Sequence, residues 1–219
     1  MSFHSNVAWA GLIVLAAACS SEAGTPTGPE LSEASALTTA TNGSKSQQSD
    51  LIMFSDFITV GGVGSLTRTP QGVNTHITVN AGVIPAGDVV TLWAAIFNNP
   101  GECAIDPCDF PDIENPAVEG SLVWLGSGIA GEGATLYTGH VMVGDASGDI
   151  LDLFGLPNGP GLLNAAGAEI HVVVRTHGPK VNGELQSQRK SFLGPNCTTD
   201  PEPNPDPCDD LAFAMFQAP

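Results

Sequence analysis

Apolar and polar residues alternate with a period of two along most of the chain from Leu51 onward. Successive side chains of a strand point to opposite faces, so this period predicts half-buried β-strands. The predicted strands are rich in Val, Ile, Thr and aromatic residues and span 51–60, 73–80, 89–97, 121–125, 134–143, 169–175 and 211–216, with 63–69 as an eighth candidate. This pattern predicts an all-β fold, an antiparallel β-sandwich or small barrel of about seven to eight strands.

Helix signals are few. The segment Glu184–Phe192 is flanked by glycines and predicts one short helix, and Ile150–Leu156 predicts a single turn. Residues 126–131, GSGIAG, match the GxGxxG pattern, but strand-forming residues follow them instead of a helix. We therefore expect a hairpin turn there, not a nucleotide site.

The N-terminus has the pattern of an export signal. Residues 7–18 are uncharged and nearly all apolar, too short to span a bilayer but of a length that suits a secretory signal. Residues 1–18 are therefore predicted to be a signal peptide. Leu15, three alanines and Cys19 resemble the lipobox of bacterial lipoproteins, which implies acylation of Cys19; residues 21–23, SEA, offer an alternative cleavage site for ordinary secretion. We expect a lipoprotein of the bacterial outer membrane or cell surface, otherwise a secreted or periplasmic protein.

Small polar residues, Pro and Gly dominate residues 20–50, without apolar periodicity. Such a composition is typical of a flexible, disordered tether. We therefore assign 19–50 to a tether and 51–219 to a single β-rich domain, which is long enough to bury a core.

Four cysteines remain once Cys19 is taken as the processed N-terminus. An even number in an exported chain predicts two disulfides, and their spacing does not fit a zinc finger. Three pairings are open. Cys103–Cys108 and Cys197–Cys208 are favoured because each closes a short loop that contains proline.

The charge is strongly acidic, with 23 Asp and Glu against 6 Lys and Arg. No Lys or Arg lies between Arg68 and Arg175. A nucleic-acid partner is excluded because neutralising phosphates needs a basic face, and an anionic lipid surface is disfavoured for the same reason. Membrane contact is therefore expected only through the lipid anchor. The acids either keep the protein soluble or attract a cation or a cationic protein partner.

Histidines on predicted strands are the first candidate metal ligands. Alternation places His171 on the face opposite to Ile170, with His177 following on the same side if the strand continues. If this strand paired with the one that carries His140, the three imidazoles could bind Cu or Zn. The alternative is that each histidine makes only local hydrogen bonds.

Carboxylates offer candidate calcium ligands. Asp145, Asp149 and Asp152 cluster beside a glycine, although their spacing is not that of an EF-hand. A denser acidic stretch, residues 102–119, contains the first predicted disulfide and is a second calcium candidate. Solvated loops are the alternative for both.

The strings GAEIHVVVRTHGP, PCDDLAFAMF and NPAVEGS, over about residues 90–219, resemble a family of secreted bacterial proteins. The strand around His171 and the GHVMVGDASG turn are similar to CHRD domains, which are β-rich extracellular modules. These resemblances imply an exported β-fold and bring no activity. The sequence favours a non-enzymatic binding or structural module over its alternative, a small metalloprotein or enzyme that uses strand histidines.

Overall fold

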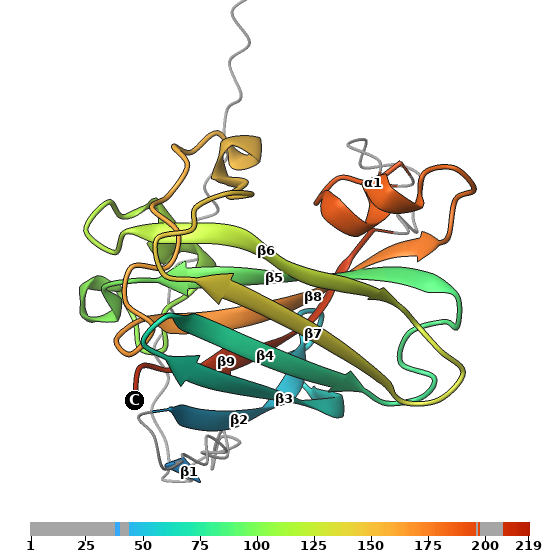
Figure 1. Cartoon of the computed structure of the whole chain (residues 1–219), viewed down its shortest axis with the longest axis horizontal. Helices are drawn as coiled ribbons and strands as arrows, with labels where there is room; N and C mark the ends of the chain where they lie inside the picture. Colours follow the sequence, from blue (N-terminus) through green and yellow to red (C-terminus); the bar gives the residue numbers. More distant parts are fainter. Residues whose placement is uncertain (1–37, 40–43, 196, 198–207) are drawn as a thin grey trace, which may run out of the picture. The chain divides into compact units, whose positions relative to one another are not determined.

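The computed structural model describes residues 38–39, 44–195, 197 and 208–219 (Figure 1). The signal peptide, Cys19 and most of the predicted tether lie outside the described residues. The elements are β1 (Thr38–Thr39), β2 (Lys45–Met53), β3 (Thr59–Thr69), β4 (Gly72–Val79), β5 (Asp88–Phe97), β6 (Gly120–Ile129), β7 (Thr135–Met142), β8 (Glu169–Pro179), α1 (Leu185–Lys190) and β9 (Asp210–Phe216), with 3₁₀ turns at Pro100–Glu102, Phe110–Glu114 and Leu151–Phe154.

One antiparallel sheet contains every strand. Its order is β6-β5-β8-β9-β2-β3-β4-β7, and β1 pairs with β2 at the side. The sheet curls until its two end strands approach each other, which makes it nearly closed and barrel-like. The predicted all-β class is therefore confirmed.

Glycines allow the two end strands, β6 and β7, to come close. A Cβ atom on Gly126 would lie 2.2 Å from the Thr138 carbonyl oxygen, and one on Gly139 would lie 2.7 Å from the Leu125 Cβ. A residue larger than glycine would push these backbones apart at the seam. The expected hairpin turn is thus only partly right: Gly126 and Gly128 lie inside β6, and Gly131 lies in the connection.

Alternate side chains of every long strand fill the interior. The buried inner cluster contains Leu66, Ile77, Leu92, Tyr137 and Val172 among others. The expected alternation in β8 is confirmed, because Ile170, Val172 and Val174 belong to this inner cluster.

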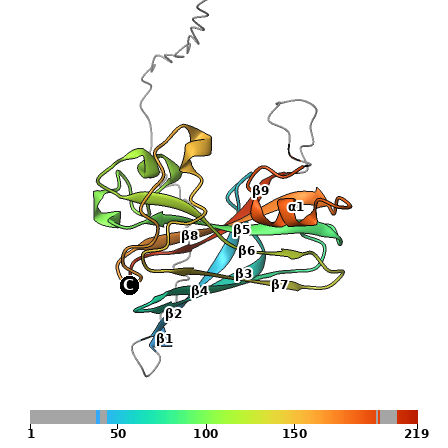
Figure 2. The same ribbon diagram turned by 45° about the horizontal axis from the view of Figure 1, so that its top comes forward.

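The outer faces of the sheet differ sharply. On β5, β6, β8 and β9, which we call the covered wall, outward side chains are buried in a second apolar cluster that includes Trp93, Phe97 and Val173. Loop residues such as Ile113 and Leu151, with Phe192 after α1, complete this cluster. Figure 2 shows the loops on one side of β5 and β8, with α1 beside β5 and β9.

The outer faces of β2, β3, β4 and β7 form the second region, which we call the bare wall. Burial alternates along β4 and β7: inward residues are buried apart from the half-buried Thr135, and outward residues are exposed or half-buried apart from the buried Gly72. Within the described residues, the second apolar cluster reaches this wall only at Ile52, near the end of β2.

Several predicted strand boundaries differ from the structure; β6 and β8, for example, continue to Ile129 and Pro179, past the ends expected at 125 and 175. The single strand expected over 51–60 is instead the end of β2, a turn at residues 54–56 and the start of β3. The first long strand begins at Lys45, before the boundary expected at Leu51, because Gln47 and Ser49 are polar yet face the interior and so hide the alternation. The predicted short helix is confirmed as α1. In the part of the chain that the structure describes, no helix has the length and apolar character needed to cross a membrane.

Candidate functional site

The bare wall presents its polar side chains in register across four strands. Strand pairing aligns the outward side chains in three rows, of which the first two are polar throughout and the third also contains two apolar residues. The rows contain Ser46, Thr67, Asn74 and His140 in the first, Gln48, Ser65, His76 and Thr138 in the second, and Asp50, Val63, Thr78 and Leu136 in the third. The first two rows hold hydroxyl, amide and imidazole groups alone, so this face can donate and accept many hydrogen bonds.

A hollow of about 210 Å³ lies between β4 and β7 on this wall. His76 and His140 both line it, together with Asn74 and Thr138. Asp145 follows β7 in the chain; hydrogen bonds from Ser147 lower the pKa of its carboxyl, and the His140 charge lowers it further. The hollow itself combines two exposed imidazoles with amide and hydroxyl groups.

The structure does not bring together the histidines that the sequence proposed as one metal site. His140 is exposed on β7, whereas His171 and His177 are buried on β8. The strand pairing that this site required does not occur, because β8 lies between β5 and β9 while β7 pairs with β4. Strand order is a long-range property that alternation along one strand does not encode.

His171 instead holds a loop. Its Nε2 lies 2.7 Å from Glu169 Oε1, and the same carboxylate oxygen accepts a hydrogen bond of 2.9 Å from the Cys108 backbone N–H. The imidazole also packs on Phe97, with ring centroids 5.0 Å apart. These contacts fix the Cys103–Cys108 loop against the covered wall.

His177 belongs to a buried hydrogen-bonded chain. Trp93 Nε1–H donates to the Thr91 hydroxyl at 2.8 Å, and this hydroxyl lies 2.9 Å from His177 Nε2. The other ring nitrogen, Nδ1, lies 3.4 Å from Cys197 Sγ. Burial, helped by the Arg175 charge, lowers the pKa of His177 to about 4, so the ring is neutral.

Both favoured disulfides are present, Cys103–Cys108 and Cys197–Cys208. Two groups of ligand-type side chains within 4.8 Å of one another occur in the described residues, and each contains one of these disulfides. Oxidised cysteines lack the thiolate that a metal needs. These groups are therefore architectural.

The aspartates proposed for calcium do not converge. Asp149 is buried and accepts hydrogen bonds from the Leu122 and Leu151 backbone N–H groups. Asp145 bonds to Ser147 and is exposed, and Asp152 stands in a 3₁₀ turn. In the acidic stretch 102–119, Asp112 accepts from the Ala104 and Asp109 backbone N–H groups, which lowers its pKa. The carboxylates of Asp149 and Asp112 therefore hold loop backbone in place through these hydrogen bonds.

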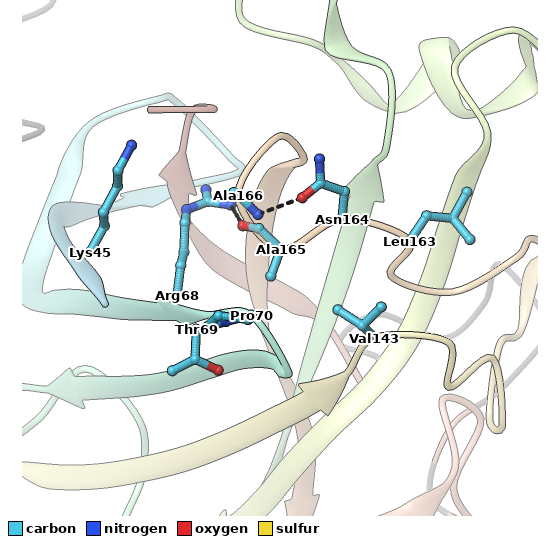
Figure 3. Close-up of a pocket in the computed structure, with 9 residues that line it drawn as sticks. All are labelled: Lys45, Arg68, Thr69, Pro70, Val143, Leu163, Asn164, Ala165 and Ala166. Carbon is cyan, nitrogen blue, oxygen red and sulfur yellow. Dashed lines mark hydrogen bonds between the residues drawn. The ribbon is translucent and has the colours of Figure 1, made fainter. Parts of the chain in front are cut away.

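Arg68 closes one end of the barrel-like sheet from inside. Its guanidinium is 2 % exposed and donates to Gln47 Oε1 and to four backbone carbonyls, those of Ala165, Ala168, Phe216 and Gln217. Burial lowers the pKa of Arg68 to about 10, and the negative charge of Glu169 opposes this lowering. The guanidinium is still protonated at neutral pH. Figure 3 shows Arg68 reaching the Ala165 carbonyl beside a hollow of about 310 Å³.

The sequence interpretation missed His76, Arg68 and Glu169. His76 had a usable signal, since it alternates with Ile77 on a predicted strand and faces outward with Asn74. Arg68 and Glu169 had none, because a buried charge on a strand is recognised only once its partners are known.

The fold is thus an all-β, barrel-like sheet with two disulfides, an apolar outer cluster on one wall and a polar face on the other. Comparisons with known protein families, with curated proteins and with solved structures found no match to the chain. The resemblances to secreted bacterial proteins and to CHRD domains stay predictions.

Proposed function

We propose that the chain is an exported, non-enzymatic binding module of the bacterial cell envelope, held there by an acylated Cys19 and a tether. The observation that carries this proposal is the bare wall, where exposed or half-buried hydroxyl, amide and imidazole groups align over four strands. The interior is filled by side chains, so recognition falls to an outer face rather than to a central cavity.

Two disulfides support the exported location, because such bonds persist in oxidising compartments. The composition of the bare wall supports an uncharged, polar ligand, such as an envelope polysaccharide, because the first two rows carry no Lys, Arg, Asp or Glu. Hydrogen bonds to such a ligand are directional and give specificity.

Binding is tested by sedimenting the purified chain with an insoluble envelope polysaccharide fraction, in the presence of EDTA. The wild-type chain and a Gln186→Lys control on the exposed side of α1 should sediment with the fraction. Thr138→Lys places a long charged side chain in the second row and should abolish sedimentation. If the wild type stays in the supernatant, or if Thr138→Lys sediments equally well, the proposed binding wall is wrong.

Anchoring is tested separately by cell fractionation. Cys19→Ala should move the protein from the membrane fraction to the soluble or extracellular fraction, whereas Ser20→Ala should leave it in the membrane fraction. The same distribution for both variants would contradict lipidation without bearing on the binding wall.

A further inference from the structure

We propose that His76 and His140 together bind a late first-row divalent cation, Cu(II) or Zn(II), on the bare wall. The site goes beyond the proposed function and does not depend on it. It also replaces the histidine set that the sequence suggested, because only His140 is shared between the two sets.

Strand register carries the proposal. His76 on β4 is paired with Thr138 on β7, and His140 on β7 is paired with Asn74 on β4. The two histidines are therefore diagonal neighbours on adjacent antiparallel strands, for which Cβ atoms lie about 7 Å apart, within reach of long or aromatic side chains. Both side chains are exposed and line the same hollow.

The chemistry of the lining suits such an ion. Imidazole nitrogen is a preferred ligand of Cu(II) and Zn(II), and the Asn74 amide oxygen offers a third donor. The six described residues that line the hollow include no Lys or Arg. Because the chain also carries no Lys or Arg between Arg68 and Arg175, the local field favours a cation.

The two buried histidines do not compete for this role. His171 is bonded to Glu169, and His177 faces Thr91 on one side and the Cys197–Cys208 disulfide on the other. An added ion therefore meets His76 and His140 at the surface without local unfolding. Of the two ions, Cu(II) should bind more tightly, as the general order of divalent affinities predicts.

Calorimetric titration tests the site with the full chain, stripped with EDTA and then transferred to a non-coordinating buffer. Cu(II) and, more weakly, Zn(II) should bind with one ion per chain. Each of His76→Ala and His140→Ala should weaken binding by about 100-fold, because one imidazole no longer gains from the effective concentration that the other provides. The double variant should lose binding in the hollow altogether, because neither imidazole remains there to hold the ion.

Two controls separate this site from others. His4→Ala removes a histidine outside the described residues, and Gln48→Ala removes a polar group from the same wall; both should bind as the wild type does. The Cu(II) electron paramagnetic resonance spectrum should show coupling to two imidazole nitrogens in the wild type and to one in each single variant. Equal affinity in all histidine variants, or loss of binding in His4→Ala alone, would overturn the proposal. Unchanged far-UV circular dichroism in each variant shows that the fold is kept.

Discussion

The covered wall and the bare wall belong to the same sheet, share one interior and face different surroundings outside. The β5 segment DVVTLWAAIF is buried at nine consecutive positions, whereas the β4 segment GVNTHITV alternates between buried and exposed. A strand buried on both faces has no polar side to show, so its sequence becomes continuously apolar. The difference teaches that the outer side chains of the covered wall serve stability, and that those of the bare wall are free to serve recognition.

The short loops of the covered wall depend on this second core. The Trp93 ring packs edge-on against Phe192, with centroids 5.4 Å apart, and Phe192 is in turn covered by the Arg175 guanidinium, 3.9 Å from its ring centre. Arg175 also pairs with Asp210 at 2.8 Å. These contacts connect β5, the segment after α1, β8 and the first residue of β9.

The largest effect is expected at Trp93, an outward residue of the covered wall. Trp93→Ala should lower the free energy of unfolding by about 4 kcal/mol, because it empties a large buried site and removes the donor to Thr91. Chemical denaturation followed by circular dichroism measures the loss. A change below about 1 kcal/mol would mean that the outer cluster does not contribute as a second core.

Arg68 sharpens the comparison from inside, because it ties β3 of the bare wall to the end of β9 and to the loop before β8. Arg68→Met should lower the free energy of unfolding by about 3 kcal/mol, because the buried acceptors lose their hydrogen-bond donors. Part of this loss is offset because the variant no longer buries a charge. Arg68→Lys is the matched control. It keeps the charge with fewer donors, and it should fall between wild type and Arg68→Met in the same denaturation experiment. If Arg68→Met unfolds with the same free energy as the wild type, the hydrogen bonds of Arg68 do not contribute to stability.

His177 makes the stability of the covered wall depend on pH. In the unfolded chain this imidazole takes up a proton near pH 6.5, whereas in the folded chain burial lowers its pKa to about 4. Between these values the unfolded state binds more protons, so stability should fall as pH decreases from 6.5 to 4, by up to about 3 kcal/mol. Below pH 4 both states are protonated and the contribution no longer changes.

His177→Gln should abolish this part of the pH dependence while retaining a group that can bond to Thr91. Thermal melts of the two proteins at several pH values between 4 and 7 measure the difference. Parallel curves for wild type and variant over that interval would contradict the low pKa.

Much of this comparison was readable in the sequence, because burial on one face or both leaves a local pattern. Alternation predicted β4, β7 and the all-β class, and the spacing of cysteines favoured the two disulfides that the structure contains. The start of β2 was not readable, since Gln47 and Ser49 face inward although they are polar.

The candidate site was less predictable than the fold. Pairing His140 with His171 needed strand order, and the sheet places β9, β2, β3 and β4 between β8 and β7 along its hydrogen-bonded path. His76 was missed for the same reason: its partner lies on a strand about 60 residues away in the sequence, and only the register brings the two together.

The smallest effect is expected on the bare wall, and it distinguishes recognition from stability there. Gln48→Ala, Asn74→Ala and Thr138→Ala each remove one exposed polar group from the first two rows. Each should change the free energy of unfolding by no more than about 0.5 kcal/mol, because exposed side chains lose little burial and cross-strand polar pairs contribute only tenths of a kilocalorie. Denaturation curves recorded beside those of Trp93→Ala measure the contrast on one scale. A loss of about 2 kcal/mol at any of these positions would show that the bare wall is held by its outer side chains as the covered wall is, and the separation of recognition from stability would then fail.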